Sequence, residues 1–369
     1  KAVILDENPF SRAAEAIDFF LTEQTFREAV ESDLDSFQTI SCFSAAAFTA
    51  FLSSRTTDDY VVNYNLIPLE ADLRQKTGFK GFDALMDEFY SSARWSSCFV
   101  YLCNYYSEYG YGPFSLYSSF IWQCSKNYSF LRNVENPDPV TLSELIDYEA
   151  ERSEVIGNTI QLLNGRQANN VLLYGDRGTG KSSTVKAIVN EYSDKGLRII
   201  EVPKMNLVDF GHIVGKLRDR MHKFIIFVDD LAFEDNEENY TALKAALEGG
   251  IESKPQNVVI YATSNRRHLV KEKFADRQGL LSANRDEEIR AQDSIQEKLS
   301  LADRFGITVV FSAPDKNKYL KIVEGIAKNR GLEIDKETLH KEALKWELWY
   351  NGRSPRTARQ FIDWLQGKK

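Results

Sequence analysis

The sequence predicts an α/β fold: a five-stranded parallel sheet, preceded by a mostly helical N-terminal domain and followed by a helical lid. Short runs rich in Val, Ile, Phe and Tyr recur after residue 170, and helix-like stretches separate them. Such runs are typical of strands buried on both faces, and their alternation with helices favours right-handed crossovers. The strand candidates are Val171–Tyr174, Arg198–Val202, Phe224–Val228, Val258–Ala262 and Ile307–Phe311.

Three domains are predicted along the 369 residues. Residues 1–136 form the N-terminal domain, because apolar side chains recur there at helical spacing. Residues 137–314 form the α/β domain; the prolines in Asn136–Pro139 disfavour helix before them and mark a linker. Just after it, Thr141–Glu144 has the form of a capping box and predicts a helix start. Residues 315–369 show only helix signals and form the lid.

The N-terminal domain contains an unusually aromatic stretch at residues 99–130, with 12 Phe, Tyr or Trp among 32 residues. Gly110–Pro113 breaks the stretch, which we interpret as two aromatic helices joined by a turn. Its side chains form either a packed core or a docking surface for a protein partner, since Tyr and Trp are favoured at interfaces. Base stacking is disfavoured because the acidic surroundings would repel phosphates.

The composition, 43% hydrophobic and 27% charged, excludes a wholly disordered or fibrous chain. The longest apolar run, residues 40–52, is too short and too rich in hydroxyls to cross a bilayer, which needs about 20 residues. We therefore expect no membrane association and a cytoplasmic location. Cys42, Cys98, Cys103 and Cys124 lie among apolar or aromatic neighbours, and we expect them to be buried, inert thiols in a reducing compartment.

The net charge of −8 is unevenly distributed. Residues 1–140 hold 10 basic and 19 acidic side chains, a net charge of −9, whereas residues 315–369 hold 13 basic and 8 acidic side chains, a net charge of +5. A chain-wide nucleic-acid binder would be basic, so the overall charge does not support nucleic-acid binding along the whole chain. It leaves open a local basic surface near the C-terminus, with a solvated helical face as the alternative.

A glycine-rich segment follows the first predicted strand and opens a helix over 182–192. Gly175–Ser182 fits the pattern G-x-x-x-x-G-K-[ST], in which glycines let several backbone N–H groups point at one anion while the helix N-terminus adds positive charge. Lys181 would reach the β- and γ-phosphates, and Ser182 would coordinate Mg²⁺. The alternative is a glycine turn without a ligand. The candidate nucleotide-binding residues here are Gly175, Asp176, Arg177, Gly178, Thr179, Gly180, Lys181, Ser182 and Ser183.

Two further strands end in polar side chains. In an open parallel sheet, functional residues lie at the carboxyl ends of strands, where the ligand binds. Asp229, after the strand Phe224–Val228, would hold Mg²⁺, and Asp230 would orient and deprotonate the attacking water. Asn265, after Val258–Ala262, could hydrogen-bond both the γ-phosphate and that water. The alternatives are a solvated strand end and an Asn turn cap.

Two arginines complete the set of candidates. Arg304 follows a predicted helix and stands just before the strand Ile307–Phe311, so it is either an arginine finger or a solvated side chain. Arg356 lies in the first turn of the last helix, next to Pro355. We expect Arg356 to project towards a nucleotide held beneath the lid.

Together these motifs resemble those of AAA+ ATPases over about residues 140–367. By this resemblance, Gly175–Ser182 is the Walker A loop, Asp229 and Asp230 form Walker B, Asn265 is sensor 1, Arg304 is the arginine finger and Arg356 is sensor 2. The resemblance implies bound ATP and Mg²⁺ and, with the strands numbered along the chain, a sheet order of 5-1-4-3-2.

One position departs from the usual AAA+ pattern. Most members have Asp-Glu in Walker B, whereas this chain has Asp229 and Asp230, as replication-initiator relatives do. Glu234 is a second candidate for the base. The sequences of residues 169–183 and 262–269 resemble more closely those of a bacterial family of AAA-superfamily ATPases that is catalogued only as a domain of unknown function.

The sequence therefore predicts a Mg·ATP-dependent ATPase that couples ATP binding and hydrolysis to conformational change of an unidentified client. Arg304 would reach the ATP of a neighbouring copy, so we expect a ring or an open helical assembly, with the N-terminal helices recruiting the client. Three alternatives remain: a nucleotide-gated scaffold or signalling switch with little hydrolysis, a DNA-associated loader or initiator-like ATPase, and a small-molecule P-loop kinase.

Overall fold

The chain folds as two compact units, residues 1–116 and 117–369. The predicted boundary after residue 136 differs from this division, because residues 117–136 belong to the second unit. The computed structural model describes residues 24–41, 80–124, 129–218, 220–231, 237–248, 255–265, 304–350 and 352–367.

The described residues of the first unit form helices. These are α2 (Gln24–Ser41), α5 (Lys80–Ser91), the short 3-10 helix η1 (Trp95–Cys98), α6 (Phe99–Tyr109) and α7 (Pro113–Leu116). Within α6, Tyr105 is buried and its ring stacks on Tyr109, with ring centroids 5.2 Å apart. This part of the aromatic stretch therefore packs against itself.

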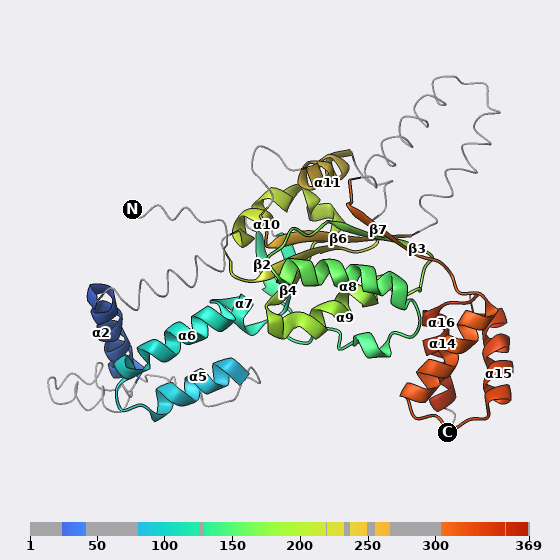
Figure 1. The fold of residues 1–369 in the computed structure, drawn as a ribbon, viewed down its shortest axis with the longest axis horizontal. Helices are drawn as coiled ribbons and strands as arrows, with labels where there is room; N and C mark the ends of the chain where they lie inside the picture. The colour runs from blue at the N-terminus through green and yellow to red at the C-terminus, as the bar shows by residue number, and fades with distance from the viewer. Residues whose placement is uncertain are drawn as a thin grey trace, which may run out of the picture. The chain divides into compact units, whose positions relative to one another are not determined.

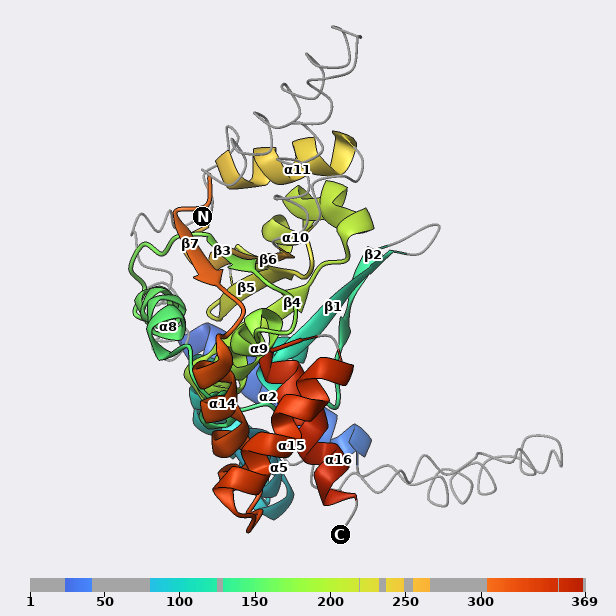
Figure 2. The ribbon, with the colours of Figure 1, turned by 90° about the vertical axis from the view of Figure 1, so that its right-hand side faces the viewer.

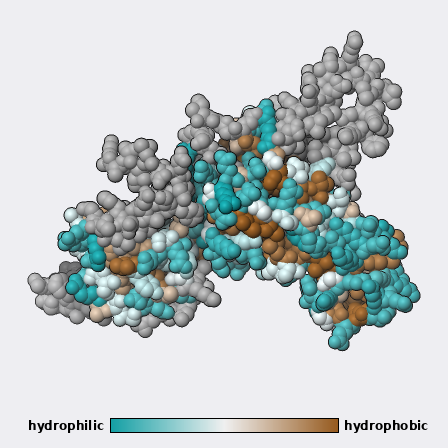
Figure 3. All heavy atoms as spheres, in the orientation of Figure 1, coloured by the Kyte–Doolittle hydropathy of each residue, from teal (hydrophilic) through white to brown (hydrophobic). Residues whose placement is uncertain are grey.

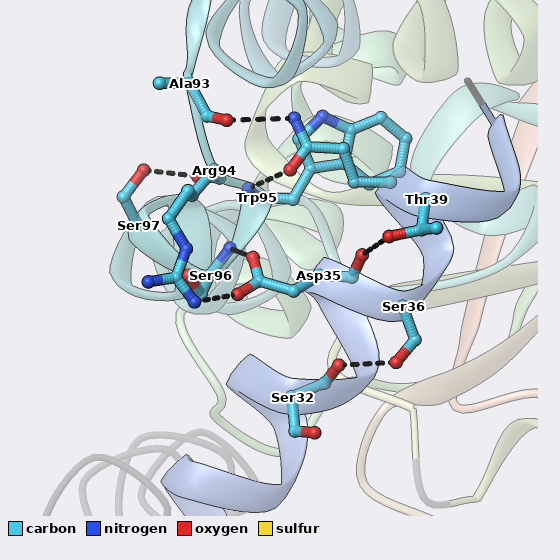
Figure 4. A network of polar contacts seen from close by, with 10 residues as sticks. Ser32, Asp35, Ser36, Thr39, Ala93, Arg94, Trp95, Ser96 and Ser97 are labelled. Atoms are coloured by element: carbon cyan, nitrogen blue, oxygen red, sulfur yellow. Dashed lines mark hydrogen bonds and ion pairs between the residues drawn. The ribbon is translucent and has the colours of Figure 1, made fainter.

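A polar network joins α2 to η1 within this unit (Figure 4). The Asp35 carboxylate accepts a hydrogen bond from the backbone N–H of Ser96 at 2.8 Å and forms an ion pair with Arg94. These two contacts lower the pKa of Asp35. Gln38 adds a further link, accepting from the backbone N–H of Trp95 at 3.0 Å. The network fixes α2 against a segment more than fifty residues later in the sequence.

The second unit is built on a seven-stranded sheet in the order β2-β1-β4-β5-β6-β3-β7. An α/β fold with a mainly parallel sheet is thus confirmed, but the predicted count of five strands is wrong. The five predicted strands lie side by side in the predicted order, and β1 and β2 extend the sheet beyond β4. The strands are β1 (Ser119–Cys124), β2 (Ser129–Asn133), β3 (Val171–Gly175), β4 (Leu197–Glu201), β5 (Lys223–Val228), β6 (Val258–Asn265) and β7 (Ile307–Phe311).

The two additional strands occupy the second half of the aromatic stretch, where we expected a helix. β1 pairs in parallel with β4 and antiparallel with β2. Phe120 and Trp122 are buried while the residues on either side are less buried, which is the period of two expected of a strand. Their aromatic side chains therefore cover one face of a hairpin, and the predicted second aromatic helix is wrong.

Helices cover both faces of the sheet (Figures 1 and 2). On one side lie α8 (Glu149–Leu163) and α9 (Lys181–Tyr192), and on the other lie α10 (Phe210–Leu217) and α11 (Glu237–Glu248). The central strand β5 is buried along its whole length, which explains its uninterrupted apolar sequence. Thr141–Glu144 does form a capping box, but it opens only the 3-10 turn η2 (Leu142–Glu144).

The C-terminal residues form three helices, α14 (Lys316–Asn329), α15 (Lys336–Trp349) and α16 (Pro355–Gln366), which we call the lid. Each begins at a side-chain cap: Asp315, Asp335 and Ser354 accept hydrogen bonds from backbone N–H groups of the first turn. Leu348 and Trp349 are exposed, and hydrophobic patches interrupt the otherwise hydrophilic surface of this part of the chain (Figure 3).

The cysteines differ from the expected pattern. Cys98 is buried and Cys103 is half-buried, but Cys124 is exposed, and its thiol donates to Asp209 at 2.8 Å. Cys42 lies outside the described residues. None of the helices in the described residues has the length and apolar run that a bilayer crossing needs.

Candidate functional site

The predicted phosphate loop leaves the carboxyl end of β3 in a conformation that glycine makes accessible. Gly175, Gly178 and Gly180 all have positive φ angles, of 139°, 75° and 95°. A Cβ atom on Gly175 would also lie 2.1 Å from the carbonyl oxygen of Phe311, so no other residue fits there. The loop then runs directly into α9, whose first residue is Lys181.

Lys181 is buried and folds back over the loop. Its Nζ atom donates to the carbonyl oxygens of Gly175 at 3.0 Å and Asp176 at 2.7 Å, and to Oδ1 of Asn265 at 3.3 Å. Burial lowers the pKa of Lys181 to about 8, against the opposing effect of the nearby carboxylates. The loop thus holds a cation at its centre by weak neutral acceptors, which a phosphate could replace.

Asp229 faces the loop and is joined to it through Ser182. The Ser182 hydroxyl donates to Asp229 Oδ1 at 2.6 Å. The same carboxylate oxygen accepts from the hydroxyl of Thr263, also at 2.6 Å. Thr263 is buried and lies two residues before the end of the neighbouring strand β6. Three elements, α9, β5 and β6, therefore converge on one carboxylate.

Asp230 lies beside it with a left-handed backbone, at φ 52°. Its N–H donates to the Thr263 hydroxyl at 2.8 Å. Its carboxylate accepts from the side-chain amide of Asn265 and forms an ion pair with Lys204 at 3.9 Å. Positive φ is uncommon outside glycine, and Asp tolerates it better than most residues. The turn is thus held in place by side chains of β6.

The lid contacts the phosphate loop directly. The backbone N–H of Arg356, in the first turn of α16, donates to the carbonyl oxygen of Gly178 at 3.1 Å. A Cβ atom on Gly178 would lie 2.9 Å from the Ser354 hydroxyl, so a larger residue there would push the lid away. Further along, Ile146 packs closely against Gly325 of α14. The lid therefore touches both the loop and the segment before α8.

These elements enclose a cavity of about 500 Å³. We call its two sets of lining residues the polar end and the apolar end. The polar end comprises Arg177, Gly178, Thr179, Gly180, Lys181, Ser182, Ser183, Thr184, Asp229, Asp230, Thr263 and Asn265. The apolar end comprises Leu145, Ile146, Ile322 and Ile326, with Tyr148 beside them. Glu144, Arg152, Pro355, Arg356 and Arg359 complete the lining.

Two predicted loop residues do not line this cavity. Gly175 forms the turn, and Asp176 accepts a hydrogen bond from the backbone N–H of Ala313 at 2.7 Å. Asp176 therefore ties the loop to the segment that leads from β7 into the lid. The second candidate base, Glu234, lies outside the described residues.

Arg304 lies at the opposite edge of the sheet from the cavity. It precedes Ile307, which pairs with Val171 at the amino end of β3, whereas Gly175 at the carboxyl end of β3 pairs with Phe311. Four residues of strand, about 13 Å, separate these two register positions. Arg304 is thus not brought to the cavity of its own chain.

The residues at the polar end fit a hydrated Mg²⁺ ion. Mg²⁺ prefers hard oxygen ligands and is held by one or two protein groups together with phosphate oxygens and waters. The Ser182 hydroxyl and the Asp229 carboxylate offer two such oxygens 2.6 Å apart. The pair is already oriented by Thr263, so little rearrangement would be needed for both oxygens to face one ion.

A family model described as "Protein of unknown function (DUF815)" matches residues 115–369. The chain belongs to the DUF815 family. The match includes residues 169–183 and 262–269, and it confirms the family of unknown function that the sequences of these residues predicted. It begins two residues before the second unit, so it takes in the β1–β2 hairpin as well as the predicted α/β domain. A search among curated proteins finds no match.

Among solved structures, the DUF815 chain is similar to the RuvB Holliday junction branch migration motor of Thermotoga maritima, at 20% identity and a TM-score of 0.41. A variant of the same RuvB gives 20% identity and a TM-score of 0.42. Each alignment covers 62% of this chain and 65% of the RuvB chain, so the DUF815 chain spans less than two thirds of the length of these proteins.

Sequence reasoning missed several residues of the DUF815 cavity. Thr263 was not predicted as a site residue because a single Thr inside an apolar strand forms no motif. Its position two residues before Asn265 was a usable signal, since alternate strand residues share a face. Tyr148 and Arg152 were missed because the capping box predicts a helix start at Thr141, whereas α8 begins only at Glu149. Lys204 reaches Asp230 from the 3-10 helix η4 (Lys204–Asp209), which follows β4.

Proposed function

We propose that this chain is a Mg·ATP-dependent ATPase of the AAA+ type, which couples ATP binding and hydrolysis to conformational change of an unidentified client. The observation that carries the proposal is the convergence of Lys181, Ser182 and Asp229 with Asp230 and Asn265 at one sheet edge. These residues come from the carboxyl ends of two strands, β5 and β6, and from the start of α9, where the phosphate loop ends. The apolar end of the cavity would take the base.

Each residue has a distinct role in this proposal. Lys181 exchanges its carbonyl acceptors for phosphate oxygens. Asp230 takes a proton from water as the water oxygen bonds to the γ-phosphorus and the bond to the β-phosphate oxygen breaks, and Asn265 orients that water. Bound Mg²⁺, held by Ser182 and Asp229, would neutralise phosphate charge. Arg356, in the lid, would contact the phosphates.

Arg304 would act on the nucleotide of a second copy. Its place at the amino end of β7 keeps it away from its own polar end. An arginine that stabilises transferring phosphate must contact that phosphate, so the proposal requires self-association into a ring or helical assembly. The helices of the first unit would recruit the client.

The experiment that tests this arrangement mixes two inactive variants. Lys181→Ala should lose nucleotide binding, and Arg304→Ala should bind ATP without turning it over. Mixed assemblies place an intact Arg304 from one variant against an intact loop from the other, so turnover should reappear on mixing. Turnover by Arg304→Ala alone at the wild-type rate would contradict the role of Arg304 in trans.

A specific observation favours a nucleotide-gated switch with little hydrolysis as the second candidate. The Asp230 carboxylate is engaged by Asn265 and Lys204, and Asp is one methylene shorter than the usual Glu. Both features would slow water activation. Turnover measured at increasing protein concentration separates the two functions, because only the ATPase should accelerate as assemblies form.

The DNA-associated alternative finds less support. It rests on the pair Asp229 and Asp230 and on the basic C-terminal residues, and several of these basic residues are ion-paired within the described lid. Arg330 pairs with Asp363 at 3.2 Å and Lys336 with Glu324 at 3.1 Å. Such pairs leave less charge for phosphates. DNA affinity that falls steeply with salt would revive this alternative.

A further inference from the structure

Arg152 is a buried guanidinium that the proposed phosphate chemistry does not use. It lies in the first turns of α8 and lines the cavity, yet its side chain is only 9% exposed. Among the described residues, the one polar contact of the Arg152 side chain is an ion pair with Glu149 at 3.9 Å, and the Glu149 side chain is 72% exposed. Burial lowers the pKa of Arg152. The effect of burial on Arg152 thus outweighs that of the nearby carboxylates.

A second buried arginine shows what a satisfied guanidinium looks like in this chain. Arg198 donates to the carbonyl oxygens of Ser193 at 2.7 Å and Leu197 at 2.8 Å. Buried polar groups are normally hydrogen-bonded in this way. Arg152 has five donors and no acceptor within hydrogen-bond distance among the described residues, so its partner is expected to come from a molecule in the cavity.

The surroundings of Arg152 identify which part of a nucleotide it would meet. The charged groups that act on it are Glu149, Asp147 and Glu151, all from the start of α8. By contrast, the charged groups that act on Lys181 belong to the phosphate loop, the two strand-end aspartates and Arg356. Arg152 follows the segment that supplies Leu145 and Ile146 to the apolar end. It is thus placed with the base and away from the phosphates.

We propose that Arg152 donates a hydrogen bond to a ring nitrogen of the bound purine and so selects the base. This inference rests on the proposed function, in that it requires nucleotide binding. Apolar walls give a base affinity but little selectivity, and a few placed polar groups fix its orientation. A guanidinium can only donate, so it requires an acceptor on the base edge.

The test measures binding of ATP and of its 1-deaza, 3-deaza and 7-deaza analogues to the wild-type chain and to Arg152→Met. We expect the wild type to bind one analogue about tenfold or more weakly than ATP, as for a lost hydrogen bond to a charged group. Arg152→Met should bind ATP and that analogue equally. If Arg152→Met weakened the binding of ATP and of all three analogues by the same factor, the assignment of Arg152 to the base would be overturned.

Thermal unfolding separates a ligand-binding role from a structural one. Removing a buried charge whose only ion pair is long, at 3.9 Å to an exposed carboxylate, should leave the nucleotide-free Arg152→Met about as stable as the wild type or more so. ATP should raise the Tm of this variant less. The control Arg198→Met should show the reverse: a lower Tm without nucleotide and an unchanged preference among the analogues. A large loss of nucleotide-free stability in Arg152→Met, with selectivity retained, would overturn the inference.

The same measurements distinguish this inference from the proposed function. A wild-type chain that binds none of the four nucleotides would contradict nucleotide binding itself. A chain that binds ATP through Lys181 but discriminates among the analogues identically with and without Arg152 would contradict only the role of Arg152.

Discussion

The Thr263 hydroxyl lies 2.6 Å from Asp229 Oδ1 and accepts the backbone N–H of Asp230 at 2.8 Å. One side chain therefore orients the carboxylate proposed to hold Mg²⁺ and fixes the backbone of the proposed base. Neither role needs direct contact with ATP. In the proposed site Thr263 would act as a positioning residue, of the kind that surrounds metal sites in proteins.

Replacing Thr263 with Val keeps the shape of the side chain but removes both contacts. We expect ATP turnover and Mg²⁺ affinity to fall by about ten- to a hundredfold, as is common for groups that orient metal ligands. Hydrogen exchange of the Asp230 amide should accelerate even without nucleotide or metal, because that N–H loses its acceptor.

Two variants serve as controls for Thr263→Val. Thr263→Ser retains the hydroxyl and should restore turnover and amide protection. Ser264→Ala removes a neighbouring hydroxyl that donates to the Leu231 carbonyl oxygen and should leave Mg²⁺ affinity unchanged. Wild-type Mg²⁺ affinity in Thr263→Val would contradict the positioning role.

The pH dependence of nucleotide binding should report on Lys181. Burial lowers its pKa to about 8, whereas a bound triphosphate would favour the charged form. Binding then takes up a proton above pH 8, so affinity should fall there, approaching about tenfold per pH unit. Isothermal titration in buffers of different ionisation enthalpy measures this proton uptake.

The stability of the nucleotide-free chain should change in the opposite direction. Because the folded-state pKa of Lys181 lies below its ordinary value of 10.5, the unfolded chain binds more protons between about pH 8 and 10.5. The contribution of Lys181 to the free energy of unfolding therefore increases with pH in that window. Lys181→Arg keeps its charge throughout this pH range and serves as the control for the fall in nucleotide affinity. An equal loss of nucleotide affinity with pH in that variant would show that a group other than Lys181 causes the loss.

Arg356 should influence both the ligand and Lys181. It lines the cavity from α16, and its charge helps to lower the pKa of Lys181. We expect Arg356→Ala to weaken ATP binding by about tenfold, as for a lost charged hydrogen bond, and to move the pH midpoint upwards. Arg330→Ala is the matched control, because Arg330 belongs to the lid and pairs with Asp363 but is not among the residues that line the cavity. A midpoint unchanged by Arg356→Ala would contradict this coupling.

The sequence predicts the central strands well because their cause is local. β5 is buried on both faces and therefore needs an apolar residue at every position. By contrast, β1 gains its structure from pairing with β4, about eighty residues later. Its aromatic residues suit a helix or a strand equally in isolation, so only the long-range pairing decides between them.

The residues of the candidate site likewise fall into those that local sequence predicts and those that only long-range packing brings to the site. The phosphate loop can be predicted because its spacing encodes a backbone turn, and Asp229 and Asn265 can be predicted because they end buried strands. Arg152 cannot be predicted, since it reads as an exposed charge among the helical residues Glu149, Glu151 and Glu154. Only the packing of the lid and the segment before α8 around the cavity encloses it.

The most direct test of the proposed ATPase compares binding with turnover in Asp230→Asn. Asn preserves the size of the side chain but cannot accept the proton from water. This variant should therefore bind Mg·ATP with wild-type affinity and release phosphate at least about a hundredfold more slowly, the lower end of the range for a positioned general base. Phosphate release by Asp230→Asn at the wild-type rate would contradict the account.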